Sequence, residues 1–598
     1  MNKTEKLICL VLGAVLAWYI FSEMGKAKER ALQSQVAEVA AQGDLSSEQP
    51  TSRPTDQVRN DLASSVSNSV SSVVEKEQKK PELHDTFVSI SNEQEVVTFA
   101  ANEFGVAIKS ITLLGYAQNV GEVSADNPPV TLDFGGRGSR AMELLGVPQA
   151  CPNGNKVTFK ADSPTSVVYD NGSMKRRFSF AGDYRIAVEE SFERTDEVNY
   201  NHSVGIGRIG MGDSKNDLLS VDSWALDAGK GKPGVIHHGD DDSPLKAYLV
   251  GGLSGGCSGS KSAAGMPESA TVSYPGGQSW IAAKNRFFVV ALASCDQPNA
   301  GFTSVVDRDV TKSNYVPKSL TAVVEFKSLP KTRSMVFYAG PKKQSLLWDL
   351  GMKDVMEFGM WRWLCYPLVW VLNLFNGWIP NFGVAIILLT ILVRLLFWPL
   401  TRKSTEGMKK MQELQPLMKE IQAKYKDNPQ RLQQETWQLY REKKVNPMSS
   451  CLPMLIQIPV FIALFNVLRS AVELRYAPFL WIADLSEPEG LFASWFPFGG
   501  LNLLPILMAV STALQSYFTP STGDKKQQQM MMVMMPAMML IMFYSFPSAL
   551  SLYWFLSNIF SIVQMWLIRR QTAAKTEALM PEVIDPPQTR QMKRHGTV

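Results

Sequence analysis

The chain has 598 residues, of which 45% are hydrophobic and only 19% are charged, and its formal net charge is +4. The charged fraction is below the roughly 25% of typical soluble proteins. The small net charge argues against binding of nucleic acid through one strongly basic domain. Long apolar runs separated by polar segments instead indicate a membrane protein.

The first predicted element is the uncharged run 7–22, which follows Lys3 and Lys6. As a helix this run spans about 24 Å, which is short for a hydrocarbon core of roughly 30 Å but sufficient if the lysines extend to the interface. We therefore expect an N-terminal transmembrane anchor over residues 1–25. A signal peptide cleaved near Gly25–Ala27 is the alternative. In both cases the residues that follow are exported.

Residues 26–82 are rich in Ser, Gln, Glu, Lys and Ala, which predicts a flexible tether. Over residues 83–340, short alternating runs are separated by turn residues, and this spacing predicts an antiparallel β-sandwich. The predicted strands are Thr86–Ile90, Glu95–Phe99, Ala107–Leu113, Lys156–Lys160, Arg177–Phe180, Tyr184–Val188, Arg286–Ala291 and Thr321–Phe326.

Residues 341–378 connect this domain to a helical region. The pattern of Leu346–Phe358 predicts an amphipathic helix, and the tryptophans of 361–378 favour an interfacial segment over a full span. We expect a five-helix core over residues 379–570. Its predicted spans are 379–400, 447–468, 501–518, 534–550 and 552–568.

The loops between these spans predict their orientation. The segment 401–446 has eleven basic and six acidic residues, 469–500 has two basic and four acidic ones, and the tail 571–598 is basic. The positive-inside rule therefore places 401–446 and the C-terminus in the cytoplasm and 469–500 outside. The apolar spacing within 401–446 predicts a helical hairpin. A solvated hairpin explains that spacing, and only the excess positive charge suggests an acidic partner, such as lipid headgroups or ribosomal RNA.

The sequence contains no convincing motif of a soluble enzyme. Gly252–Gly256 matches G-x-S-x-G, but a Gly/Ser-rich loop follows where a nucleophile elbow needs a helix. No G-x-x-x-x-G-K-[ST] sequence is present. His237-His238 precede three aspartates, which an exposed polar loop explains better than a metal site. We expect no catalytic residue, cofactor or metal.

The six cysteines do not form a disulfide framework in so long a chain. Cys257 and Cys295 could pair in an exported domain, but Cys151 competes with them. The sequence leaves this choice open.

Arg394 is the most informative residue, because it lies in an apolar predicted span. A membrane-embedded arginine is costly and usually faces a bundle interior or water, although this one could also extend to the nearby cytoplasmic end. Other predicted spans add polar residues, which could be interhelical contacts. No carboxylate lies in any of the five spans to neutralise Arg394. We therefore expect a hydrated groove that opens to the cytoplasm. Its predicted residues are Arg394, Thr390, Gln457, Gln515, Tyr553, Trp554, Ser557 and Asn558.

Several short motifs together resemble the YidC membrane protein insertase family, over about residues 345–570. They are Leu392–Arg394, Phe397–Thr401, Val445–Pro447, Cys451–Pro453, Gln457–Pro459, Glu473–Arg475, Ala477–Phe479, Phe546–Ser548, Leu552-Tyr553 and Ser557-Asn558. The anchor, tether and β-sandwich resemble the Gram-negative form of the family, which has a large periplasmic domain. The family often has two adjacent tyrosines where this chain has Tyr553-Trp554.

The resemblance implies a non-enzymatic insertase and folding chaperone of the bacterial inner membrane, with a periplasmic β-domain. It implies that Arg394 is the positive residue of a groove that receives nascent membrane proteins, alone or beside the Sec translocon. It further implies contacts with membrane lipids and, through 401–446 and the C-terminal tail, with the ribosome and the signal recognition machinery. A secondary transporter that uses Arg394 as an anion site is the alternative, but the five spans show no inverted repeat.

Overall fold

The computed structural model describes residues 85–579. The gaps within this range are 103–104, 122, 137, 148–156, 194–197, 211–218, 228–231, 239–267, 309–316, 427, 444, 446–451, 492–499 and 520–524. The described residues form two compact units. One holds those up to 370 together with 463–487, and the other holds 371–462 and those from 488 onward. The predicted anchor and tether lie outside the described residues, as do Cys151 and Cys257.

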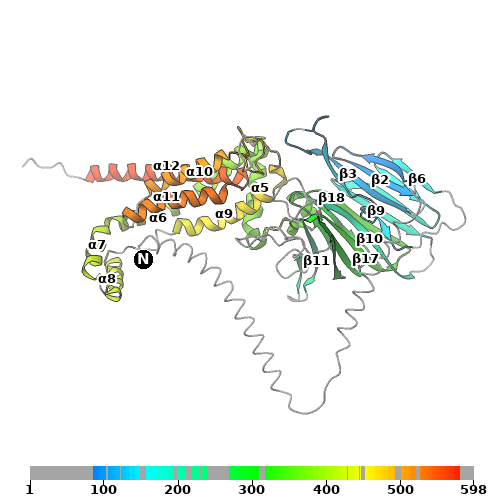
Figure 1. The fold of residues 1–598 in the computed structure, drawn as a ribbon, viewed down its shortest axis with the longest axis horizontal. Helices are drawn as coiled ribbons and strands as arrows, with labels where there is room; N and C mark the ends of the chain where they lie inside the picture. Colours follow the sequence, from blue (N-terminus) through cyan, green and yellow to red (C-terminus); the bar gives the residue numbers. More distant parts are fainter. Residues whose placement is uncertain are drawn as a thin grey trace, which may run out of the picture. The chain divides into compact units, whose positions relative to one another are not determined.

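The first unit consists of antiparallel strands in three sheets (Figure 1). The strands are β1 (Thr86–Ser91), β2 (Glu95–Asn102), β3 (Gly105–Ala117), β4 (Pro129–Asp133), β5 (Leu144–Leu145), β6 (Thr158–Ser163), β7 (Ser166–Asp170), β8 (Met174–Gly182), β9 (Arg185–Phe192), β10 (Val198–Gly210), β11 (Ser220–Asp227), β12 (Lys232–His237), β13 (Ser269–Pro275), β14 (Trp280–Lys284), β15 (Phe288–Cys295), β16 (Gly301–Arg308), β17 (Pro317–Leu329) and β18 (Thr332–Pro341). The predicted order of a β-rich domain before a helical region is confirmed.

The largest sheet has nine strands in the order β12-β11-β14-β15-β18-β9-β8-β7-β6. The five-stranded sheet, β13-β16-β17-β10-β5, packs against it through β10, β14, β15 and β17. The four-stranded sheet has the order β1-β2-β3-β4. Burial alternates along β9, as expected for a strand with one covered face, whereas all five residues of β14 are buried.

Arg286 was predicted to lie in a strand, and this prediction is wrong. It lies in the turn between β14 and β15, where the Asn285 side chain accepts hydrogen bonds from the backbone N–H groups of Phe287 and Phe288. An asparagine that bonds the backbone two and three residues later stabilises a turn. The turn directs Arg286 to the loop after α9 (Leu452–Ser470), where it donates to the carbonyl oxygen of Ser486 at 2.6 Å and also pairs with Glu487.

The prediction of a single amphipathic helix over Leu346–Phe358 is also wrong. Helix α4 (Gln344–Asp349) ends just before Gly351, whose φ is +69°. A glycine in the left-handed region is a common helix terminator. A short 3₁₀ helix, η2 (Lys353–Met356), follows and ends at Glu357.

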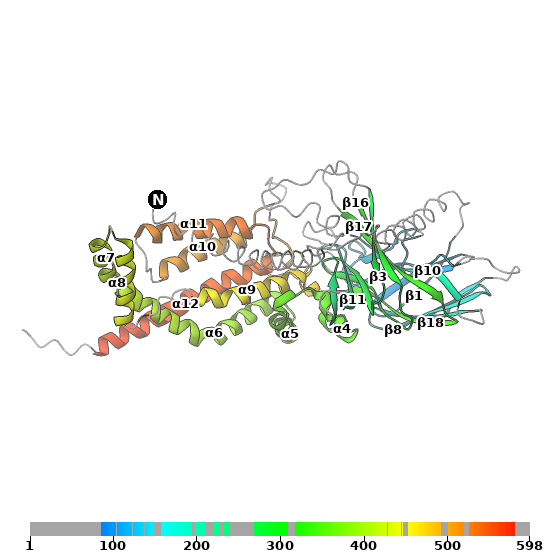
Figure 2. The same cartoon turned by 90° about the horizontal axis from the view of Figure 1, so that it is seen from below.

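Helices dominate the second unit (Figure 2). They are α6 (Phe382–Glu413), α7 (Gln415–Lys424), α8 (Pro429–Glu442), α10 (Leu503–Phe518), α11 (Lys525–Phe543) and α12 (Ser548–Leu579), and α5 (Arg362–Trp378) and α9 also contribute residues. Helix α12 packs against α6 and α10, and α10 packs against α11. In the described part of the chain, two helices are long and apolar enough to cross a bilayer, Phe382–Glu413 and Ser548–Leu567. The shorter apolar helices are Gln457–Ser470, Leu503–Phe518 and Met532–Phe543.

Several helix boundaries differ from the predicted spans: α11 begins at Lys525 rather than at residue 534, and α12 continues to Leu579 rather than ending at 568. The break expected between 550 and 552 lies instead between Phe543 and Ser548, because Pro547 cannot continue a helix and its carbonyl oxygen accepts the first bonds of α12, from Leu550 and Ser551. Helix α6 does not end near residue 400 but continues to Glu413, through Pro399.

The segment after α6 forms a helical pair, α7 and α8, which lie side by side (Figure 2). Its small core contains Met411, Leu414 and Val445, with Tyr440 packed against it. Asn428 caps α8, since its side chain accepts the N–H of Arg431.

Candidate functional site

A polar cluster lies among the helices of the second unit, and Arg394 of α6 is its charged member. The guanidinium is half-buried and donates a hydrogen bond to the hydroxyl of Ser557, which is 3% exposed on α12. In the described part of the chain, no carboxylate forms an ion pair with Arg394. The hydroxyl of Ser557 hydrogen-bonds to the guanidinium but does not neutralise its charge, although removing a charge from water is costly.

A second polar contact joins α9 and α12. The Gln457 side-chain amide donates to the Tyr553 hydroxyl at 2.8 Å. Tyr553 is 1% exposed, and it lies one helical turn before Ser557 on the same face of α12. The two turns of α12 therefore present adjacent polar groups to α9 and α6.

A third contact joins α12 and α10. The Asn558 amide donates to the hydroxyls of Ser511 at 3.0 Å and Thr512 at 2.9 Å, and all three residues are buried. Sequence patterns had not singled out Ser511 and Thr512, because isolated hydroxyl residues are common in apolar helices. Gln515, which was predicted to belong to the groove, is half-buried on α10 and makes none of these side-chain contacts.

Two other predicted groove residues, Thr390 and Trp554, make their contacts outside the polar cluster. Thr390 is fully buried, and its hydroxyl donates to the carbonyl oxygen of Ile386 at 2.7 Å within α6. The Trp554 ring packs edge-on against Phe461, with centroids 5.0 Å apart, and against Phe543 at 5.5 Å. Trp554 therefore contributes an aromatic cluster beside the polar one.

This arrangement suits recognition better than catalysis. The polar cluster, defined by Arg394, Gln457, Tyr553, Ser557 and Asn558, contains one permanent positive charge together with hydroxyl and amide groups. No carboxylate, histidine or cysteine among the described residues joins it to serve as a general base or nucleophile. A cation of this kind attracts carboxylates and polar backbone groups.

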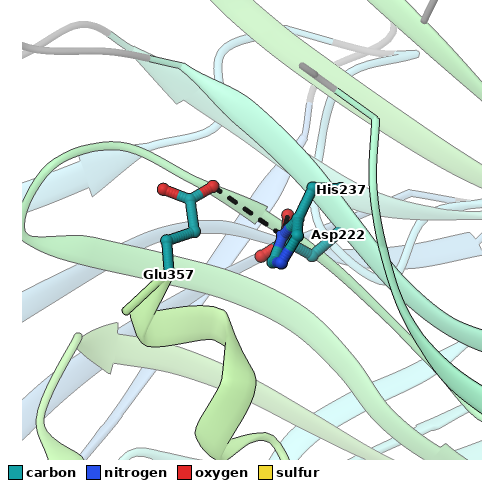
Figure 3. Close-up of side chains that lie close together, drawn as sticks. All are labelled: Asp222, His237 and Glu357. Carbon is teal, nitrogen blue, oxygen red and sulfur yellow. Dashed lines mark hydrogen bonds and ion pairs between the residues drawn. The ribbon is translucent and has the colours of Figure 1, made fainter. Parts of the chain in front are cut away.

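One group in the β unit has the residue types of a metal site. The ligand atoms of Asp222, His237 and Glu357 lie within 4.8 Å of one another, and Figure 3 shows Glu357 facing His237 and Asp222. The Lys284 ammonium, however, pairs with Asp222 and lies 2.8 Å from Glu357. The lysine supplies the positive charge that a metal ion would bring, so these residues do not fit a metal centre.

The charges in this group stabilise one another. Burial alone would raise the pKa of Glu357, but the charges of Lys284 and Lys342 and the hydrogen bond from Lys284 together outweigh it and lower the pKa to about 2. Burial disfavours protonation of His237, yet its hydrogen bond to Asp222 at 2.9 Å and the negative charges of Asp222 and Glu357 together outweigh that effect and raise its pKa. His238 was expected in an exposed loop, which is wrong. It is 6% exposed and bonded to Ser223, and burial lowers its pKa to about 4.

Comparisons with known proteins agree on one family. The family model described as "60Kd inner membrane protein" matches residues 374–575, and that described as "YidC periplasmic domain" matches residues 257–371. A protein of Prosthecochloris aestuarii named "Membrane protein insertase YidC" is 32% identical over 458 residues, which are 73% of this chain and 76% of that protein. One of the same name from Syntrophobacter fumaroxidans is 40% identical, and the match spans 49% of this chain and about half (53%) of that relative's length.

Proposed function

Because this chain belongs to the YidC membrane protein insertase family, we propose that its polar cluster receives hydrophilic segments of nascent membrane proteins on their way across the inner membrane. The observation that carries this proposal is the Arg394 guanidinium, which is half-buried among the helices and has no carboxylate partner in the described part of the chain. A guanidinium without a counter-ion needs water or an arriving anionic group. The cluster is therefore a hydrated groove open to the cytoplasm.

The groove lowers the cost of translocation. A hydrophilic segment that crosses intact hydrocarbon loses the hydration of every backbone and charged group. Polar groups on α6, α9 and α12 replace part of that hydration over part of the path, and Arg394 attracts acidic residues of the segment. Gln457 and Tyr553 supply hydrogen-bonding groups, whereas Thr390, Gln515 and Trp554 form the surrounding wall.

The apolar part of the substrate leaves sideways into lipid. Helix α11 offers a strongly exposed apolar surface for this step, with Ile541 80% and Val533 69% exposed. Met534, Met538 and Met542 lie on the same helix and are exposed too. Unbranched methionines adapt to substrates of different shape. Burial of apolar surface in the bilayer supplies the driving force without ATP.

The orientation follows from the basic residues. Lys419, Lys424, Arg431 and Arg441 of the α7–α8 pair are exposed, which suits a cytoplasmic location. Helix α8 also carries a groove lined in part by Trp437, which is 54% exposed. This pair and the C-terminal tail are the proposed contact sites for the ribosome, the signal recognition machinery and anionic lipids, and the Sec translocon is a proposed partner within the membrane.

The test is insertion of substrates that differ only in the charge of a short exported tail. Arg394→Ala should leave folding intact and reduce insertion of the acidic-tailed substrate several-fold more than that of its neutral counterpart, while Arg394→Lys should retain most activity. If the alanine variant reduced insertion of both substrates by the same factor relative to wild type, or reduced neither, the proposal would be contradicted. A photocrosslinker at Gln457 should capture a stalled nascent chain through its hydrophilic segment. The control is position 396, because Leu396 is 70% exposed on the apolar surface of α6.

A further inference from the structure

The loop that follows α9 carries an exposed apolar tip, which we define as residues 477–483. The tip has the sequence Ala-Pro-Phe-Leu-Trp-Ile-Ala and contains no charged side chain. Leu480 is 76% exposed and Trp481 is 42% exposed, and Pro478 and Ala483 are exposed as well. Scattered apolar residues are ordinary on a protein surface, but four in one uncharged segment form a patch that needs an explanation.

The shape of the apolar tip is fixed by hydrogen bonds. Phe479 and Ile482 form an isolated antiparallel bridge, with N–H···O distances of 2.9 and 2.8 Å, so Leu480 and Trp481 occupy the turn between them. The Asp484 carboxylate accepts the N–H groups of Tyr476 at 3.0 Å and Ser486 at 2.7 Å. These bonds tie the two ends of the tip together.

The base of the loop is held by the β domain of the same unit. The Arg475 guanidinium donates to the carbonyl oxygen of Ala117 at 2.8 Å, and the Tyr476 hydroxyl donates to that of Gln118 at 2.9 Å. Arg286 holds the other end of the loop through Ser486 and Glu487. The apolar side chains of the tip are therefore presented on a fixed support.

Leu480 is not explained by the fold. Its φ is +52°, in the left-handed region where glycine and asparagine are favoured and where a leucine is strained. Its side chain is also 76% exposed, so packing within the chain does not compensate that strain. Neither the backbone nor the packing favours leucine at this position, which points to an apolar environment outside the protein.

We propose that the apolar tip inserts into the interfacial zone of the lipid bilayer on the exported side. This inference rests on the proposed function and on the predicted topology, in which the spans 447–468 and 501–518 cross the inner membrane and residues 469–500 lie on the exported side. Ala477 lies only seven residues beyond Ser470, the last residue of α9, so the tip stays within roughly 25 Å of the end of that helix. Tryptophan and leucine suit the boundary between headgroups and acyl chains, and the lack of charge in the tip lowers the cost of insertion.

The experiment measures lipid contact of the tip in the full-length protein. A cysteine-depleted chain carrying Leu480→Cys is labelled with an environment-sensitive fluorophore and reconstituted in nanodiscs of bacterial phospholipids. Lys331→Cys is the control, because Lys331 is exposed in the turn between β17 and β18. The label at 480 should show blue-shifted emission, at least twofold stronger quenching by brominated lipids than the label at 331, and weaker quenching by aqueous iodide.

Equal iodide quenching at both positions, without quenching by brominated lipids, would overturn the proposal. So would a blue shift at 480 that brominated lipids do not quench, since it would indicate a protein partner or a second copy. Leu480→Gly guards against a folding artefact, because glycine relieves the positive φ and should leave the thermal midpoint in detergent at least as high as wild type. Insertion assays on the same samples separate the two proposals. If the label at 480 is exposed to water while insertion still depends on Arg394, only the proposed lipid contact is overturned.

Discussion

The Lys284 ammonium on β14 lies 2.8 Å from the Glu357 carboxylate, which follows η2, so a fully buried lysine joins the nine-stranded sheet to the segment that leads to α5. Lys284 is 1% exposed and also pairs with Asp222. Removing one partner of a buried ion pair leaves the other charge without compensation.

Lys284→Met should therefore destabilise attachment of residues 353–357 to the sheet by about 3–5 kcal/mol. Hydrogen exchange of this segment, measured on the full-length protein in detergent, should be strongly accelerated. Lys160→Met is the matched control, since Lys160 is exposed on β6 and should not change the exchange rate. Unchanged protection of 353–357 in the Lys284 variant would show that the pair does not hold the segment.

His237 and His238 should give the β unit opposite dependences on pH. The pKa of His237 is raised, so its contribution to stability is fully present below the unfolded value of about 6.5 and is lost as the pH rises through its folded pKa. The pKa of His238 is lowered to about 4, so stability is lost as the pH falls from about 6.5 towards 4.

Thermal unfolding followed from pH 4 to 9 tests this pair. His237→Gln should remove the loss on the alkaline side, and His238→Gln should remove the loss on the acidic side. The same pH profile in both variants as in the wild type would mean that other groups dominate the titration.

The contact between Gln457 and Tyr553 should contribute a modest coupling between α9 and α12. Hydrogen bonds between membrane helices average about 0.6 kcal/mol and reach about 1.7 kcal/mol in double-mutant cycles. A cycle of Gln457→Leu and Tyr553→Phe, with unfolding in mixed micelles, should give a coupling in this range. Additive effects of the two substitutions would argue that the bond contributes nothing.

Arg286 should control the order of the loop after α9. Its guanidinium donates to Arg469 and Ser486 and pairs with Glu487. Arg286→Met should raise hydrogen exchange over residues 484–487 several-fold, since it breaks every one of these contacts. Arg177→Met provides the comparison, because the ion pair of Arg177 with Asp162 is exposed and its loss should leave this loop unchanged. Normal protection of 484–487 without Arg286 would assign the order of the loop to its own hydrogen bonds.

The sequence predicted the succession of a β-rich domain and a helical region because alternation and long apolar runs are local signals. It also singled out Arg394, since a charge is conspicuous in an apolar run. It did not predict the contacts of Asn558 with Ser511 and Thr512, nor the group of Lys284 and Glu357, because these depend on pairings between distant segments.

Local chemistry also misled in places. Gly351 interrupts the helix that the spacing of Leu346–Phe358 predicted, and Asn285 converts the expected strand at Arg286 into a turn. The aspartates after His238 suggested an exposed loop, whereas the imidazole is buried against the rings of Tyr274 and Phe302. In each case a single backbone or packing feature decided the local structure against the hydrophobic and polar pattern of the surrounding sequence.

Helix α6 is a single element from Phe382 to Glu413, and it holds both Arg394 and Met411, which packs in the core beneath α7 and α8. At 1.5 Å per residue, about 25 Å of continuous helix separates the two side chains. Pro399 removes one backbone hydrogen bond along this length, so the helix is weakest at that position. One continuous helix therefore connects the α7–α8 pair directly to the polar cluster, without an intervening loop.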